Sequence, residues 1–190
     1  MIDYTAILRE KLKYLKPREL YSDRMKKAAV LALFATTSGD TELILTRKAQ
    51  GIGYHSDQIS FPGGTVEEKE TTVQTALRET KEEIGIEKRY IEIIGRFHDD
   101  SVPISKYIVT PYAALLKTKP VFKLQASEVK EVFTVPFDFF MDELNYTPQQ
   151  VMIRDNALTV DGYNYHDRII WGLTCRFIRT LVDIVKDTSL

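Results

Sequence analysis

The sequence lacks several features that would by themselves assign a class. Its single cysteine, Cys175, allows no internal disulfide and no cysteine-based zinc cluster. No apolar stretch approaches the roughly 18 residues that a membrane-spanning helix needs, and no apolar signal-like region follows the first methionine. The formal net charge of -1 gives no case for a nucleic-acid-binding surface. We therefore expect a cytoplasmic protein that binds neither membranes nor nucleic acid.

Two common catalytic motifs are absent as well. The chain has no G-x-S-x-G turn, which argues against a serine hydrolase, and no H-E-x-x-H helix of the kind that binds zinc in peptidases. Apolar residues make up 44% of the chain and charged residues 28%, as in an ordinary globular protein. At 190 residues it is long enough for one domain with a sizeable core, so we expect a single domain over residues 1–190.

One stretch, Gly63 to Ile86, organises the rest of the chain. It opens with a Phe-Pro-Gly-Gly turn, and no glycine or proline occurs between Thr71 and Glu83, so a helix is allowed there. Gly85 is placed to end that helix. The apolar residues recur at spacings of three, four and seven, as on one side of a helix: Val73, Ala76, Leu77 and Ile84.

Three glutamates of this helix, Glu79, Glu82 and Glu83, fall on neighbouring positions. Like charges at such spacings repel by a few tenths of a kcal/mol (~0.2–0.5) per pair, so helix stability alone does not favour them. A bound divalent cation reverses the sign of that interaction, and oxygen ligands of this kind suit Mg2+ or Mn2+. The alternative is a solvated charged face, since lysines nearby could offset the acids: Lys69, Lys81 and Lys88.

The spacing around the glutamates is distinctive. Counting from Gly64, five residues lead to Glu70, seven more lead to Arg78-Glu79, and the run ends in Glu-Glu-Ile-Gly-Ile at residues 82–86. Residues 64–86 thus resemble the Nudix box, G-x5-E-x7-R-E-U-x-E-E-x-G-U, in which U is a bulky aliphatic residue. Thr80, at the first U position, is the single departure.

This resemblance implies a fold and a reaction. The fold is an α/β/α sandwich with a mixed sheet, in which the box forms a loop, a helix and a second loop. The reaction is hydrolysis of the diphosphate linkage of a nucleoside diphosphate derivative with Mg2+ or Mn2+. The residues point to the same reaction, because the negative charge of a diphosphate protects it from attack by hydroxide. Bound cations neutralise that charge and lower the pKa of a coordinated water.

Family roles follow position by position. The resemblance implies that Glu79, Glu82 and Glu83 are metal ligands, with the backbone carbonyl of Gly64 as a further one. It implies an ion pair that holds the loop against the helix, formed by Glu70 and Arg78. The general base is one of the three helix glutamates or a glutamate from a later loop. Two residues are candidates for that later glutamate, and the sequence does not choose between them: Glu128 and Glu131.

A second resemblance concerns the substrate. Residues 44–49 and the Phe61-Pro-Gly63-Gly64 turn look like the extra motif of coenzyme A pyrophosphatases, LLTxR[SA]x3Rx3Gx3FPGG, and later segments of the chain agree with that subgroup. Three positions depart from the motif: Lys48 and Gly53 each replace an arginine, and Asp57 replaces a glycine. The residues expected to contact substrate are Arg47, Lys48, Phe61, Gly63 and Gly64.

Coenzyme A, cleaved to 4'-phosphopantetheine and 3',5'-ADP, is therefore the first substrate to consider. Loss of an arginine at position 53 removes one planar group able to grip phosphate through two hydrogen bonds. The alternative substrate is another nucleoside diphosphate derivative, such as ADP-ribose, a nucleotide sugar or a dinucleotide. A binding module without catalysis is a further alternative, although a pure binder has no need of three metal carboxylates.

The remaining segments predict a layered α/β domain. An apolar face predicts an N-terminal helix over about residues 3–16, which either caps the core or pairs with a second copy in a homodimer. Pro111 predicts a sheet edge or bulge, and Asp161-Gly162 predicts a hairpin turn. A four-residue apolar repeat from Ile169 to Val185 predicts a C-terminal helix containing Trp171 and a packed Cys175. Strands are predicted at 28–35, 42–46, 91–97, 107–116, 131–135, 151–154 and 158–165, and a short helix at 137–144.

Overall fold

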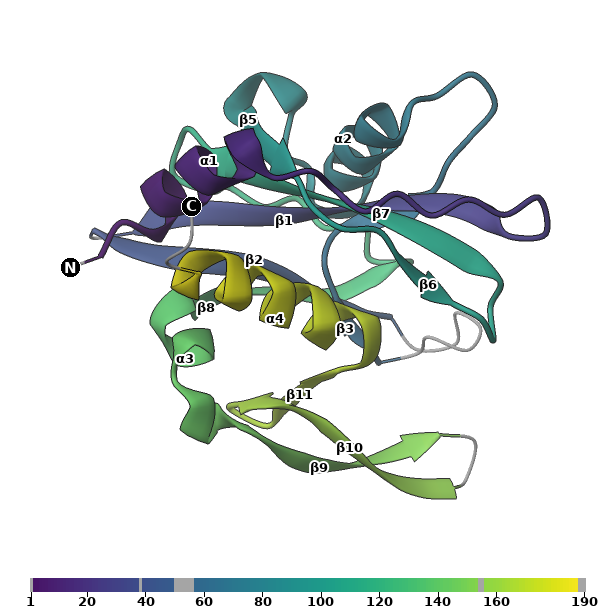
Figure 1. Cartoon of the computed structure of the whole chain (residues 1–190), viewed down its shortest axis with the longest axis vertical. Helices are drawn as coiled ribbons and strands as arrows, with labels where there is room; N and C mark the ends of the chain where they lie inside the picture. The colour runs from purple at the N-terminus through teal and green to yellow at the C-terminus, as the bar shows by residue number, and fades with distance from the viewer. Residues whose placement is uncertain (1, 38, 50–56, 154–155, 188–190) are drawn as a thin grey trace.

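The computed structural model describes residues 2–37, 39–49, 57–153 and 156–187. Gly53 and the end of the strand predicted at 151–154 lie outside these residues. The main element is a mixed sheet with the strand order β3-β2-β1-β7-β5, in which β4 pairs with β1, β6 with β7, and β8 with β2 (Figure 1). Its strands are β1 (Lys26–Thr37), β2 (Asp40–Lys48), β3 (Ile59–Ser60), β4 (Gly63–Thr65), β5 (Ile91–Arg96), β6 (Asp100–Val102), β7 (Tyr107–Leu116) and β8 (Val129–Pro136).

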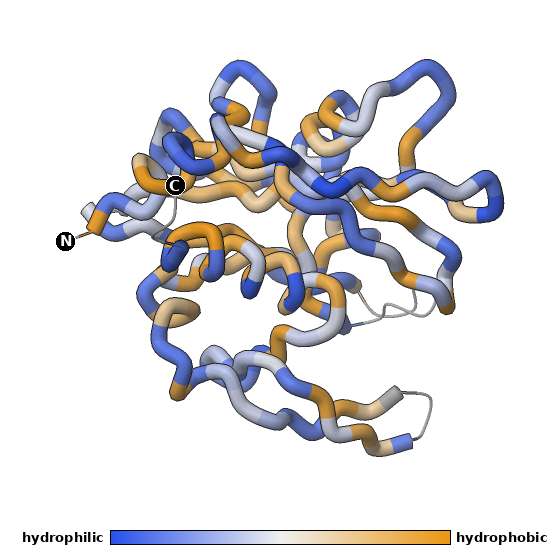
Figure 2. The backbone as a smooth tube through the Cα atoms, viewed as in Figure 1, coloured by the Kyte–Doolittle hydropathy of each residue, from blue (hydrophilic) through white to orange (hydrophobic). Residues whose placement is uncertain are grey.

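The two faces of this sheet are covered by different helices. Alternate residues of β1 point to opposite faces, as the period of a strand requires. Leu31 and Leu33 pack in one apolar cluster with α2 (Thr72–Ile84), whereas Ala32 and Phe34 pack in another with α1 (Tyr4–Tyr14) and α4 (Gly172–Lys186). Hydrophobic residues follow the central strands and α4, and the outer loops are hydrophilic (Figure 2). The predicted α/β/α sandwich is therefore confirmed.

Helix α1 covers the core of its own chain. Leu8 and Leu12 are buried in the cluster that α4 also joins, and the helix is capped by Asp3, whose side chain accepts a hydrogen bond from the backbone N–H of Ala6. The structure thus shows that this segment covers the core of its own chain.

Pro111 does not lie at an edge, so the first of its two predicted alternatives, a sheet edge or a bulge, was wrong. It is in β7, an interior strand that pairs in parallel with β1 along most of its length. The missing N–H is tolerated because Pro111 falls where one antiparallel neighbour, β6, gives way to the next, β5. Its carbonyl accepts the N–H of Phe97 at 3.2 Å, and the register shift lies in β5, between Ile93 and Gly95.

A second, three-stranded sheet lies beside α4, and here the hairpin prediction was wrong. It comprises β9 (Tyr146–Ile153), β10 (Asn156–Tyr165) and β11 (Arg168–Trp171). Asp161 and Gly162 lie inside β10, where Gly162 pairs with Thr147 on one side and Trp171 on the other. A Cβ on Gly162 would come within 2.5 Å of the carbonyl oxygen of Ile170, so this glycine serves close strand packing instead of a turn.

The C-terminal helix begins later than predicted. Ile169 and Trp171 belong to β11, and α4 starts at Gly172, whose φ of +63° breaks the strand. Cys175 is buried against the core, as expected. The short helices are α3 (Phe137–Met141), η2 (Lys88–Tyr90) and η3 (Glu143–Asn145). Within the described residues, α4 is the longest helix, and none has the length and apolar character needed to cross a membrane.

Candidate active site

Helix α2 is fixed at both ends. Thr71 caps its start, because its hydroxyl accepts the N–H of Gln74 while the Gln74 side chain accepts the N–H of Thr71. Gly85 ends it in the left-handed conformation, with a φ of +77°. Two carbonyls of the last turn, those of Glu83 and Ile84, accept backbone N–H groups from Gln125 and Lys123 at 3.0 and 2.9 Å. The loop that precedes β8 is therefore tied to this end of the helix.

Thr80, the departure from the Nudix pattern, is accommodated within α2. Its side chain is completely buried, and its hydroxyl donates a hydrogen bond of 2.7 Å to the carbonyl of Ala76. A threonine can thus stand where the pattern has an aliphatic residue, because its one polar atom is satisfied by its own helix.

The glycine turn brings the sheet backbone against α2. A Cβ on Gly63 would come within 2.3 Å of the Ala29 carbonyl oxygen, so only glycine allows β4 to lie this close to β1. A Cβ on Gly64 would come within 2.2 Å of the Oε1 atom of Glu79. The structure therefore places the Glu79 carboxylate directly beside the Gly64 backbone.

Arg78 donates hydrogen bonds to three carboxylates. Its Nε and Nη2 donate to the two oxygens of Glu70 at 2.8 and 3.1 Å, so the expected pair is present and is bidentate. Its Nη1 donates to Glu79 at 2.8 Å and to Glu82 at 2.9 Å. Hydrogen bonds from Arg78 and from the Thr75 hydroxyl lower the pKa of Glu70 to about 2.

The three helix glutamates differ in their contact with water. The side chain of Glu83 is 1% exposed, that of Glu79 14% and that of Glu82 54%. Burial raises the pKa of Glu79 and that of Glu83, because loss of water disfavours the charged form. Two buried carboxylates beside a third favour a compensating cation.

Lys48 supplies one such cation. Its Nζ donates to the Oε1 atom of Glu83 at 2.5 Å, and the N–H of Gly63 donates to the other oxygen of Glu83 at 3.3 Å. The sequence predicted a substrate contact for Lys48, and the structure places its ammonium group on a carboxylate of the helix.

The arrangement fits a divalent cation. Glu79, Glu82 and Glu83 offer hard oxygen ligands, and the glycine cradle at Gly64 leaves room for a carboxylate where a Cβ would otherwise stand. In the part of the chain that the structure describes, no three acidic, histidine or cysteine side chains already surround one point. The acids hold the cations of Arg78 and Lys48 instead.

Two predicted substrate contacts are not brought to α2. Phe61 is 2% exposed and packs in the cluster on the α4 face, so the structure places its side chain in the core and away from α2. Arg47 follows Leu43 and Leu45 at alternate positions of β2, and both of these leucines pack on the α4 face. Arg47 bonds Asp57 at 2.9 Å there, away from the glutamates.

The two candidate glutamates from outside the helix, Glu128 and Glu131, differ in their position relative to α2. Glu131 pairs with Arg47 across β2 and β8, so it shares the face of Arg47, and Arg168 donates to it at 3.2 Å. Glu128 is exposed, and its carbonyl accepts the N–H of Ala49 at 2.9 Å, one residue beyond Lys48. Only Glu128 therefore belongs to a loop adjoining the α2 carboxylates.

A hollow of about 300 Å3 adjoins Glu82 at the end of α2, and no sequence pattern indicated it. Residues far apart in the chain form it, and its second wall comes from a segment without helix or strand. The lining side chains are Lys81, Glu82, Glu87, Lys123, Leu124 and Gln125.

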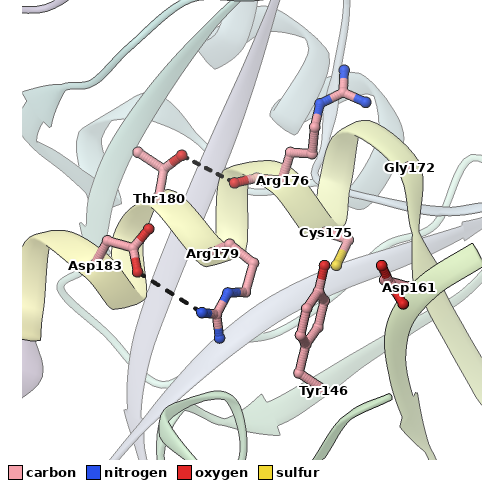
Figure 3. A pocket seen from close by; sticks show the side chains of 8 residues that line it. All are labelled: Tyr146, Asp161, Gly172, Cys175, Arg176, Arg179, Thr180 and Asp183. Carbon is pink, nitrogen blue, oxygen red and sulfur yellow. Dashed lines mark hydrogen bonds and ion pairs between the residues drawn. The ribbon is translucent and has the colours of Figure 1, made fainter. Parts of the chain in front are cut away.

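Another hollow, of about 490 Å3, lies between α4 and the second sheet (Figure 3). Tyr146 and Asp161 face α4 across it. The arginines that line it are already paired, Arg176 with Asp100 at 2.6 Å and Arg179 with Glu143 at 2.7 Å. Because α4 covers the sheet face opposite α2, this hollow is separate from the glutamates.

Comparison with known proteins gives consistent results. The model of the NUDIX domain matches residues 25–155. NudL of Photorhabdus laumondii subsp. laumondii, named an uncharacterized Nudix hydrolase, is 31% identical over 174 residues, which cover 90% of each protein. Nudix hydrolase 22, chloroplastic, of Arabidopsis thaliana is 31% identical over 171 residues, which cover 85% of this chain and 56% of that protein.

A solved structure shares the fold. The binary complex of an Ap4A hydrolase from C. elegans superposes with a TM-score of 0.51 at 24% identity. The superposition covers 60% of this chain and 82% of the other. It supports the α/β/α architecture around α2.

Proposed function

Because this chain belongs to the NUDIX domain family, we propose that it hydrolyses the diphosphate linkage of a nucleoside diphosphate derivative with Mg2+ or Mn2+. The observation that carries the proposal is the position of Glu79, Glu82 and Glu83, which line one side of α2 beside the Gly63-Gly64 turn. When bound there, the cation neutralises the diphosphate and lowers the pKa of a coordinated water.

The residues of the chain have separate tasks. The three glutamates and the carbonyl of Gly64 would hold the cation. Arg78 is a positioning residue, because its two bonds to Glu70 fix the guanidinium that in turn orients Glu79 and Glu82. The general base would be one of the helix glutamates or Glu128, whose loop is tied to α2. Glu131 is disfavoured as the base because it lies on the side of β8 that faces away from the helix glutamates.

The finer proposal for the substrate is coenzyme A. It is supported by the match of residues 44–46, 49 and 61–64 to the motif of coenzyme A pyrophosphatases. One observation favours the alternative, another nucleoside diphosphate derivative such as ADP-ribose. Arg47 and Lys48 are the two residues that could compensate for the missing arginine. Arg47 is bonded to Asp57, the residue that stands where the motif has glycine, and Lys48 is bonded to Glu83.

A panel of substrates tests both levels of this proposal. The protein is incubated with coenzyme A, ADP-ribose, NADH and nucleotide sugars in the presence of Mg2+ or Mn2+, and the products are identified by mass spectrometry. We expect coenzyme A to yield 4'-phosphopantetheine and 3',5'-ADP. A clear preference for ADP-ribose would overturn the coenzyme A proposal and leave the reaction class standing. No cleavage of any diphosphate would favour a binding module.

A further inference from the structure

We propose that Lys48 is an exchangeable counter-ion of the metal site: it holds Glu83 until a divalent cation binds, and the displaced ammonium group then binds the phosphates of the substrate. This inference rests on the proposed function and concerns how cation and substrate binding are coupled in that site.

The position of Glu83 makes the exchange necessary. Its carboxylate is almost completely buried, and both oxygens have partners, the ammonium of Lys48 at 2.5 Å and the N–H of Gly63 at 3.3 Å. A divalent cation that takes Glu83 as a ligand would lie within a few ångströms of the Lys48 ammonium (~4 Å), and like charges at such distances repel strongly when water is excluded. The Gly63 N–H carries no net charge and can stay.

Arg78, the other cation of the site, is held differently. Its bidentate bond to Glu70 remains when Glu79 and Glu82 turn to a metal, so the guanidinium keeps its place. Among the described residues, Lys48 has one carboxylate within bonding distance, that of Glu83, and its ammonium is carried on a flexible stem. Lys48 is therefore the cation that is free to move.

The displaced ammonium has a nearby destination. Lys48 is the last residue of β2, its side chain is 23% exposed, and it lies on the α2 face of the sheet beside the glycine turn. A diphosphate bound by the cation would bring its oxygens close to this partly exposed end of β2. Lysine binds phosphate as a point charge. Cation and diphosphate would then each strengthen binding of the other, because such coupling is reciprocal.

Calorimetry on the whole protein tests this coupling without turnover. Mn2+ and α,β-methylene-ADP, a diphosphate that cannot be hydrolysed at its bridging carbon, are titrated singly and together. The variants are Lys48→Gln, Lys48→Arg as a variant that keeps the charge, and Lys130→Gln as a control lysine that pairs with Asp57. Thermal unfolding confirms that each is folded.

In Lys48→Gln we expect Mn2+ alone to bind at least about fivefold more tightly, since its competitor is gone. The coupling, which is the factor by which the analogue tightens Mn2+ binding, should fall by at least about tenfold. Lys48→Arg should retain most of the coupling, and Lys130→Gln all of it. Weaker Mn2+ binding in a folded Lys48→Gln protein, or unchanged coupling, would overturn the inference. If the wild type shows the coupling but cleaves no diphosphate, the hydrolase proposal fails and this inference stands.

Discussion

The carboxylate of Glu79 lies against the backbone of Gly64, so closely that a Cβ at position 64 would come within 2.2 Å of Oε1. The two residues are 15 positions apart in the chain. The contact explains why the turn before α2 needs glycine although its φ is not positive. The side chain that is missing from Gly64 provides the space in which a metal-binding carboxylate can lie.

Gly64→Ala should therefore displace Glu79. A shift of about 1 Å in a catalytic group can cost about 100-fold in rate, so we expect a loss of that order in kcat, measured at saturating Mg2+ with the substrate that the panel identifies. Gly162→Ala is the matched control, because its Cβ would meet the Ile170 carbonyl oxygen at 2.5 Å far from α2. The control should lose stability and keep its kcat. Equal losses of kcat in both variants would contradict the role of Gly64.

The Glu70–Arg78 pair should make stability depend on pH in a defined window. Arg78 lowers the pKa of Glu70 to about 2 from an ordinary value of 4.5, so the contribution of the pair is complete above pH 4.5 and is lost as pH falls toward 2. Wild-type protein and Glu70→Gln are unfolded with urea at neutral pH and through that window. The wild type should be the more stable at neutral pH, and the difference should shrink on acidification. A constant difference would contradict the ionic pair.

Glu131→Gln should leave turnover unchanged within about twofold, because Glu131 lies on the face of Arg47 and bonds Arg168. It should cost about 0.2–1 kcal/mol of unfolding free energy, as for other partly exposed ion pairs. Glu128→Gln, the comparison variant, should lower kcat by more than Glu131→Gln does. A larger loss of kcat in Glu131→Gln would return Glu131 to the active site.

Cys175 should be chemically inert in the folded protein. It is 3% exposed, and burial raises the pKa of its thiol to about 11, so little thiolate exists at neutral pH. We expect a thiol reagent such as DTNB to react slowly at neutral pH and fully after denaturation, with Cys175→Ala keeping its activity. Rapid labelling of the native protein together with loss of activity would contradict this.

The sequence predicted α2 and its immediate partners well, for a local reason. The apolar stripe and the terminal Gly85, from which the helix was predicted, are both set by neighbours within a few positions. The pairing of Glu70 with Arg78, which the family resemblance implied, also spans only eight residues. The signals for the helix itself are local, so residue spacing alone is informative there.

Contacts across the sheet were less predictable. Lys48 reaches Glu83 over 35 positions, and Arg47 beside it points to the other face. In β2 both faces are buried, so the apolar run Leu43-Ile44-Leu45 has no alternation from which the face of Arg47 or Lys48 could be inferred. The same uncertainty applied to Glu131, and Phe61 is likewise hidden by packing that local pattern does not encode.

Glycine and proline misled for a related reason. Gly162 was interpreted as a turn, but it serves close packing of β10 on β11. Pro111 was expected at an edge or a bulge, and it lies in an interior strand where the antiparallel pairing is interrupted between two consecutive neighbours of β7. Both residues mark a special backbone environment, and tertiary structure decides whether that environment is a turn, a sheet edge, a bulge or close strand packing.

The most direct test is a titration with Mn2+ followed by electron paramagnetic resonance, in which the signal of the free ion disappears as the ion binds. Wild-type protein, Glu82→Gln and a control on the exposed surface, Glu68→Gln, are compared at neutral pH. We expect saturable binding in the wild type and in Glu68→Gln, and binding at least about tenfold weaker in Glu82→Gln. Equal binding in all three proteins, or none in the wild type, would contradict the assignment of the α2 glutamates as the metal site.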